Sequence, residues 1–148
     1  MKSLKIYIYP VIEFLLILLW IYAALSKLIS FDEFKGQMYN QTFSRGISEL
    51  LTYFLPPLEL TAAVLLIPNR TKMAGLVLSL VLMSSFTVYI SLVMLNFWAR
   101  VPCSCGGILQ KMGWKPHLWF NLFFLALIAI AINSKIKERS LCDNRTIA

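Results

Sequence analysis

The chain alternates between long apolar runs and short polar segments. A helix that spans a bilayer needs about 20 mostly apolar residues, and in hydrocarbon its backbone must satisfy its own hydrogen bonds, so such runs predict helices. The runs cover residues 7–25, 50–67, 73–97 and 118–132. We therefore expect an all-α membrane protein, a bundle of four transmembrane helices within a single integral-membrane domain over residues 1–148. The expected helices cover residues of about 6–28, 48–67, 72–97 and 117–134.

The polar segment after the first run carries a helix-start signal of its own. Ser30 is followed three residues later by Glu33, which is the spacing of a capping box. Phe31, Phe34 and Met38 then recur at helical spacing. We expect a short amphipathic helix on the outer surface between the first two spanning helices. An irregular loop anchored by its aromatic side chains is the alternative.

Gly75 and Ser79 stand four residues apart on the third apolar run. Small residues at this spacing allow a neighbouring helix to approach closely inside a membrane. The pair therefore predicts a close helix–helix contact.

Composition narrows the class of protein further. Hydrophobic residues make up 59% of the chain and charged residues 14%, which is too little polar surface for a soluble domain of this size. A soluble enzyme, a disordered chain and a nucleic-acid-binding module are therefore not expected. The sequence also contains no glycine-rich phosphate loop and no nucleophile–His–Asp set, so we expect no self-contained catalytic domain. Any catalysis would be thiol–disulfide chemistry.

The basic residues suggest an orientation in the membrane. Four spans place both termini on one side, and that side would hold eight of the 14 Lys and Arg residues. The positive-inside rule then favours cytoplasmic termini in a bacterial inner membrane, with loops 30–47 and 98–116 outside. Cys103 and Cys105 fall in an outer loop and Cys142 in the inner tail, which suits an oxidising exterior and a reducing cytoplasm.

The close cysteine pair is the strongest chemical signal. A disulfide between Cys103 and Cys105 would close a small, strained ring, and a strained bridge is more oxidising than a structural one. A redox-active dithiol is one interpretation. A soft-metal site that also uses Met112 or His117 is a second, and an inert pair is a third.

Two carboxylates lie within apolar runs, where each costs a few kcal/mol. Counting residues from the ends of the runs places Glu13 and Glu59 at about the same depth in the bundle. They are expected to form either an internal hydrogen-bond network that fixes helix packing or a site for a proton or small molecule. The polar residues that could join such a network are Ser84, Ser85, Thr87 and Asn121.

Three segments together resemble the MauE family, a branch of the DoxX-like membrane proteins named for methylamine utilisation. The first helix ends in small residues followed by Lys27, and the second carries a Pro-x-x-Glu stretch that ends at Glu59. The third segment is Pro102-Cys103-Ser104-Cys105-Gly106-Gly107, in which Gly106 replaces the aromatic residue common in the family. Trp114 and a last apolar helix follow, as they do in the family.

The resemblance implies an inner-membrane protein that works with periplasmic thioredoxin-like proteins, in some settings during maturation of a disulfide-rich dehydrogenase subunit. We expect Cys103 and Cys105 to exchange disulfides with such a partner. Glu13, Lys27 and Glu59 are the candidate intramembrane binding residues. A small transporter or soft-metal delivery protein is the alternative function. The sequence identifies no cofactor, and a quinone between the helices is conceivable without direct support. Oligomeric state is not indicated.

Overall fold

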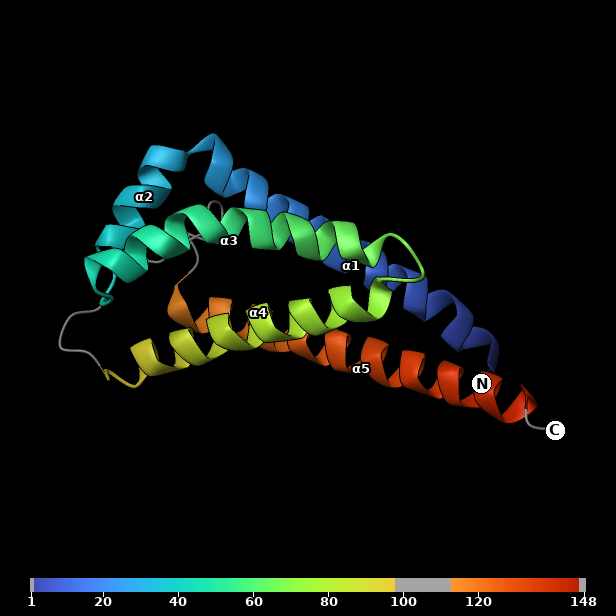
Figure 1. Ribbon diagram of the computed structural model, residues 1–148. Helices are drawn as coiled ribbons and strands as arrows, with labels where there is room; N and C mark the ends of the chain where they lie inside the picture. Colours follow the sequence, from blue (N-terminus) through green and yellow to red (C-terminus); the bar gives the residue numbers. More distant parts are fainter. Residues whose placement is uncertain (1, 98–112, 147–148) are drawn as a thin grey trace.

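The computed structural model describes residues 2–97 and 113–146. Every secondary-structure element within these two ranges is a helix (Figure 1). Over these ranges four helices are long and apolar enough to cross a membrane, which confirms the expected all-α architecture. A short fifth helix, α2, follows the first of them. The helices are α1 (Lys2–Ile29), α2 (Phe31–Tyr39), α3 (Arg45–Leu66), α4 (Lys72–Met94) and α5 (Trp114–Thr146).

The helices pack in neighbouring pairs along the bundle. Helix α1 packs against α3, α3 against α4, and α4 against α5, with α5 returning to contact α1. Both termini lie at one end, while α2 lies at the other end, packed against α3 (Figure 1). This arrangement agrees with four crossings of one membrane.

Polar and apolar side chains are distributed as expected for a bilayer. On α1, Val11, Phe14 and Leu18 are 53–64% exposed and follow one helix face at intervals of three and four residues. The interior holds large apolar groups such as Trp20 and Leu16, together with polar side chains that are almost fully covered. These buried polar residues are Glu13, Lys27, Gln41, Ser48, Thr52, Glu59, Ser79, Thr87 and Asn121.

Several helix boundaries differ from the sequence expectation: α1, α3 and α5 begin three or four residues earlier than expected, and α4 and α5 end at other residues. Helix α4 ends at Met94, not at residue 97, because Asn96 has a left-handed backbone with φ of 52°. The Phe97 N–H donates to Leu92 O and the Asn96 N–H to Val93 O, which is the hydrogen-bond pattern of a Schellman helix stop. Helix α5 extends to Thr146, since its polar C-terminal part contains neither glycine nor proline to end it.

The expected amphipathic helix is present as α2, although it is not held by the expected capping box. The Ser30 side chain makes no capping hydrogen bond. Instead Phe34 and Met38 are buried against Leu55 of α3, so the apolar face of α2 is covered by the bundle. Burial of two side chains, more than local capping, positions this helix.

Helices α3 and α4 meet closely at their short connection, as the small residues predicted. A Cβ atom on Gly75 would lie 2.9 Å from the backbone nitrogen of Leu66 and 3.0 Å from the carbonyl carbon of Leu65. One turn further along α4, Ser79 accepts a 2.8 Å hydrogen bond from Nε1 of Trp20. The absence of a side chain at Gly75 therefore sets the α3–α4 distance.

Replacing Gly75 by Ala should destabilise the bundle by about 1–3 kcal/mol, because the added methyl group meets rigid backbone. Unfolding of the purified protein by sodium dodecyl sulfate in mild detergent would measure the change. Gly46→Ala is the matched control, since a Cβ at Gly46 has nothing within 4 Å. Equal stability of the two variants would contradict the close contact.

Candidate functional site

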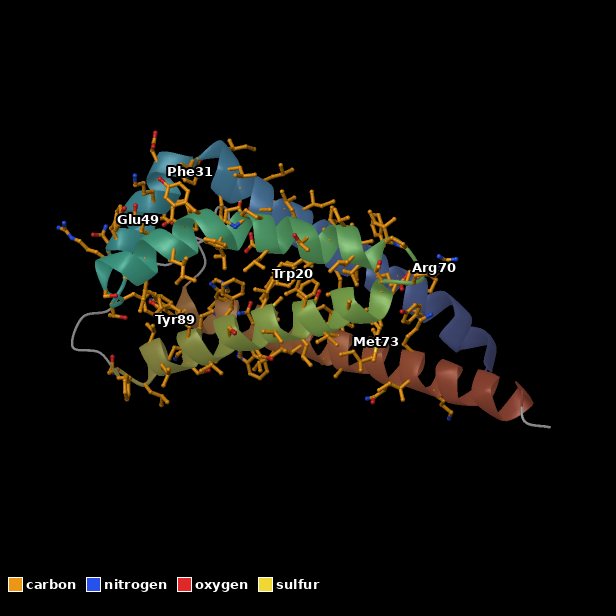
Figure 2. The ribbon with its side chains drawn as sticks, in the orientation of Figure 1. Trp20, Phe31, Glu49, Arg70, Met73 and Tyr89 are labelled. Carbon is orange, nitrogen blue, oxygen red and sulfur yellow. The ribbon has the colours of Figure 1, made fainter. Side chains whose placement is uncertain are left out.

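A cavity of about 330 Å³ lies among all five helices, toward the end of the bundle that carries α2. Most of its wall is apolar and much of that is aromatic. Figure 2 shows Trp20 in the middle of the bundle and Tyr89 nearer the α2 end, and both side chains line the cavity. Further aromatic lining comes from Phe34, Phe86, Trp114 and Phe120.

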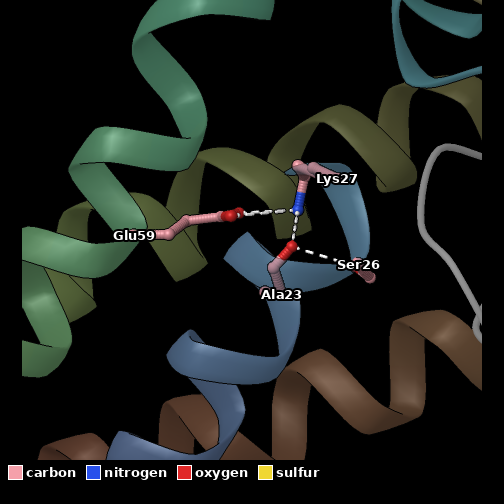
Figure 3. Close-up of polar contacts among 4 residues, drawn as sticks. All are labelled: Ala23, Ser26, Lys27 and Glu59. Atoms are coloured by element: carbon pink, nitrogen blue, oxygen red, sulfur yellow. Dashed lines mark hydrogen bonds and ion pairs between the residues drawn. The ribbon is translucent and has the colours of Figure 1, made fainter. Parts of the chain in front are cut away.

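The polar centre of the cavity is an ion pair between α1 and α3. The Lys27 Nζ lies 2.8 Å from Oε1 and 3.1 Å from Oε2 of Glu59, and donates a further 3.0 Å hydrogen bond to the Ala23 carbonyl oxygen (Figure 3). The Ser26 hydroxyl donates to the same carbonyl oxygen. Glu59 is only 1% exposed and Lys27 8%. The ammonium thus has a partner for each of its three protons.

Aromatic packing covers this ion pair on its outer side. The Lys27 Nζ lies 5.8 Å from the ring centroid of Phe34, within cation–π range. Phe34 belongs to α2, so the short helix closes the cavity over the charged groups. The buried ring of Phe34 therefore packs next to the Lys27–Glu59 ion pair.

Glu13 belongs to a different site. Its Oε2 accepts a 2.7 Å hydrogen bond from Lys72 Nζ at the start of α4. Glu13 and Lys27 are fourteen residues apart on α1, or roughly 21 Å along the helix axis. The expectation that Glu13 and Glu59 lie at one depth is wrong. Depths counted from the ends of the apolar runs are not comparable here, because α1 begins at Lys2, before its apolar run, and extends beyond α3 (Figure 1).

The structure thus brings together two of the three expected intramembrane residues, Lys27 and Glu59, and separates Glu13 from them. Cys103, Cys105 and Met112 lie outside the described residues. The helices on either side of that segment do reach the cavity. Tyr89 and Ile90 near the end of α4 line it, as do Trp114 and His117 at the start of α5.

Two polar side chains on the cavity wall have atoms with no hydrogen-bond partner among the described residues. These atoms are Nδ1 of His117 and Nδ2 of Asn121, one turn apart on α5. Nearby, the Tyr89 hydroxyl donates to Oε1 of Gln41. The sequence suggested His117 as a soft-metal ligand and gave no signal for Gln41 or Tyr89. The i, i+4 spacing of His117 and Asn121 in an otherwise apolar segment was the available signal.

These features define a class: a four-span membrane protein with a buried Lys–Glu pair in an aromatic cavity. The family model "Methylamine utilisation protein MauE" matches residues 5–134, which is most of the chain. The chain therefore belongs to the MauE family, whose name links it to methylamine utilisation. Comparison with curated proteins and with solved structures gave no match.

Removing either charge of the Lys27–Glu59 pair should cost about 3–5 kcal/mol of stability, because the remaining charge is left buried without a partner. The double variant Lys27→Met with Glu59→Leu should lose less than the two single changes added together. Detergent unfolding of the four proteins would give this coupling energy.

Glu49→Gln supplies the control on the same helix, since Glu49 is exposed near the α2 end (Figure 2). It should leave stability unchanged. Additive effects of the Lys27 and Glu59 changes would show that the two side chains do not interact.

Proposed function

We propose that this protein is a thiol–disulfide redox partner in the bacterial inner membrane. Cys103 and Cys105 exchange a disulfide with a periplasmic thioredoxin-like protein, in maturation of a disulfide- or cofactor-containing protein of the methylamine-utilisation type. One observation carries the proposal. The chain that contains the Cys-x-Cys pair leaves from α4 and returns at α5, and both of these helix ends line the cavity that holds Lys27 and Glu59.

The exchange itself needs only thiols and a disulfide. A thiolate of one cysteine attacks the disulfide of the other protein, a mixed disulfide forms, and the displaced sulfur leaves as a thiolate. The second cysteine then attacks the mixed disulfide and releases the partner in its dithiol form. The Cys103–Cys105 pair is oxidised as the partner's disulfide is reduced, and the reverse exchange follows the same steps.

The buried ion pair supports this chemistry through protons. In exchange with a disulfide the two electrons and two protons pass to the partner, whereas oxidation of the Cys103–Cys105 dithiol by an acceptor other than a disulfide releases two protons with the two electrons. Glu59 can take up a proton inside the bundle. Hydrogen bonds from Lys27 to both carboxylate oxygens hold the Glu59 side chain in place. A carboxylate next to a cavity is more useful for proton uptake than one sealed in a packed core.

The proposed orientation places both termini in the cytoplasm. They lie at one end of the bundle (Figure 1), and Arg70 lies toward the same end (Figure 2). Lys72 and Lys135 both lie within 6 Å of the Tyr9 ring, with Nζ-to-centroid distances of 5.9 and 5.7 Å. Basic residues are enriched at the cytoplasmic side of membrane proteins.

This orientation predicts which cysteines an impermeant thiol reagent can reach. After reduction of intact spheroplasts, Cys103 and Cys105 should be labelled and Cys142 should not, as read by mass spectrometry of the purified protein. Permeabilised cells, in which all three should react, provide the control. Labelling of Cys142 alone would invert the orientation and contradict the proposed function.

The redox role predicts that a single cysteine variant traps its partner. Cys103→Ser leaves Cys105, which two glycines follow in the sequence, and should accumulate a reducible adduct with a thioredoxin-like protein. Cys105→Ser should trap less. Non-reducing gels followed by mass spectrometry of the adduct would decide this.

The double variant, which lacks both thiols, and Cys142→Ser, which keeps both, are the matched controls for trapping. Neither should accumulate the adduct. Absence of an adduct in both single variants, together with stoichiometric metal in the purified wild-type protein, would favour soft-metal delivery instead.

A further inference from the structure

The cavity wall contains a hydrogen-bond donor that the described protein does not satisfy. Asn121 is 3% exposed, and its Nδ2 has no partner among residues 2–97 and 113–146. Buried polar atoms of native proteins are almost always hydrogen-bonded, so an unpaired one calls for an explanation. Because Asn121 lines the cavity, a bound molecule with an acceptor atom would supply the missing partner.

The charges around the cavity specify a neutral molecule. Lys27 donates two hydrogen bonds to the Glu59 carboxylate and one to the Ala23 carbonyl oxygen, and the carboxylate compensates its charge inside the protein. An anionic ligand would need an unpaired cation, and a cationic ligand would compete with Lys27 for Glu59. An uncharged ligand disturbs neither group.

The remaining side chains of the cavity wall indicate the shape of the bound molecule. Aromatic side chains from four helices, including Trp20, Phe34 and Phe86, face a space of about 330 Å³. Binding pockets for small molecules begin at roughly this size. Such a wall suits a flat ring, and a cavity inside a membrane bundle suits a molecule that dissolves in lipid.

From this combination we infer that the cavity binds the ring of a lipid-soluble quinone, with a ring carbonyl oxygen accepting a hydrogen bond from Asn121 Nδ2. A neutral flat ring with carbonyl acceptors meets each requirement above. The choice of a quinone among such molecules rests on the proposed function. Conversion of a dithiol to a disulfide yields two electrons and two protons, and these convert one quinone to one hydroquinone, so no further reactant is needed.

Binding can be measured through the tryptophans that line the cavity, Trp20 and Trp114. Full-length protein in quinone-free phosphatidylcholine nanodiscs would be titrated with decylubiquinone, with tryptophan fluorescence as the readout. Wild type should show saturable quenching above the linear quenching caused by quinone in the lipid. Linear quenching alone would overturn the inference.

Asn121→Leu should weaken the saturable phase about tenfold, the effect of one lost hydrogen bond of typical strength. Asn133→Leu makes the same change on an exposed residue further along α5 and should bind as wild type. Equal affinities in all three proteins would overturn the role of Asn121. Should Asn121→Leu fail to fold, photolabelling of wild type by an azidoquinone must mark peptides that line the cavity, and labelling confined to peptides outside the cavity contradicts the site.

Two further binding measurements distinguish a quinone site from a lipid-chain pocket and separate this inference from the proposed function. Decanol, which has the alkyl tail without the ring, should not displace decylubiquinone, and full displacement would instead identify a lipid-chain pocket. The Cys103→Ser, Cys105→Ser double variant should bind decylubiquinone as wild type does. Absence of a trapped partner in both single cysteine variants, with saturable quinone binding by wild type, would contradict only the proposed function. Trapping in a single variant without saturable binding by wild type would contradict only this inference.

Discussion

The arrangement of the bundle depends on the ion pair between Lys27 and Glu59. A charged side chain in a membrane-spanning helix costs about 2.5–3.5 kcal/mol on insertion scales, and the two charges compensate each other only when α1 and α3 meet at one relative height. The observed contact, with Nζ within 2.8 Å of Oε1, fixes that height. The ring of Phe34 on α2 packs near the Lys27 ammonium, and the cavity lies beside the same two charged groups.

A second ion pair fixes the opposite end of the same helix. Glu13 on α1 contacts Lys72 at the start of α4, while Lys27 reaches α3. Helix α1 is therefore joined to two neighbours at two depths. Between these joints Leu16 and Trp20 are buried in the apolar core, and Trp20 donates a hydrogen bond to Ser79. Apolar contacts between helices have little directional preference, so the polar contacts determine how α1 is positioned against α3 and α4.

The sequence was sufficient to predict the spans, because an apolar run of bilayer length is a one-dimensional signal. It also marked Glu59 as a carboxylate in an apolar segment, and the family resemblance marked Lys27. Their pairing was not predictable, since it depends on which helices are neighbours and on their relative heights. The error over Glu13 has the same origin. The early end of α4 depended on the backbone of a single residue, Asn96, which no periodic pattern reveals.

The order of the ion-pair residues along the chain has a consequence for biosynthesis. Lys27 is synthesised 32 residues before Glu59, so α1 reaches the membrane before its counter-charge exists. Until α3 arrives, the lysine must remain near the headgroups or within the insertion machinery. Helix α1 therefore cannot settle at its final depth alone. Its insertion is completed together with that of α3, and a nascent chain truncated before Glu59 would hold its first helix in a shallower position.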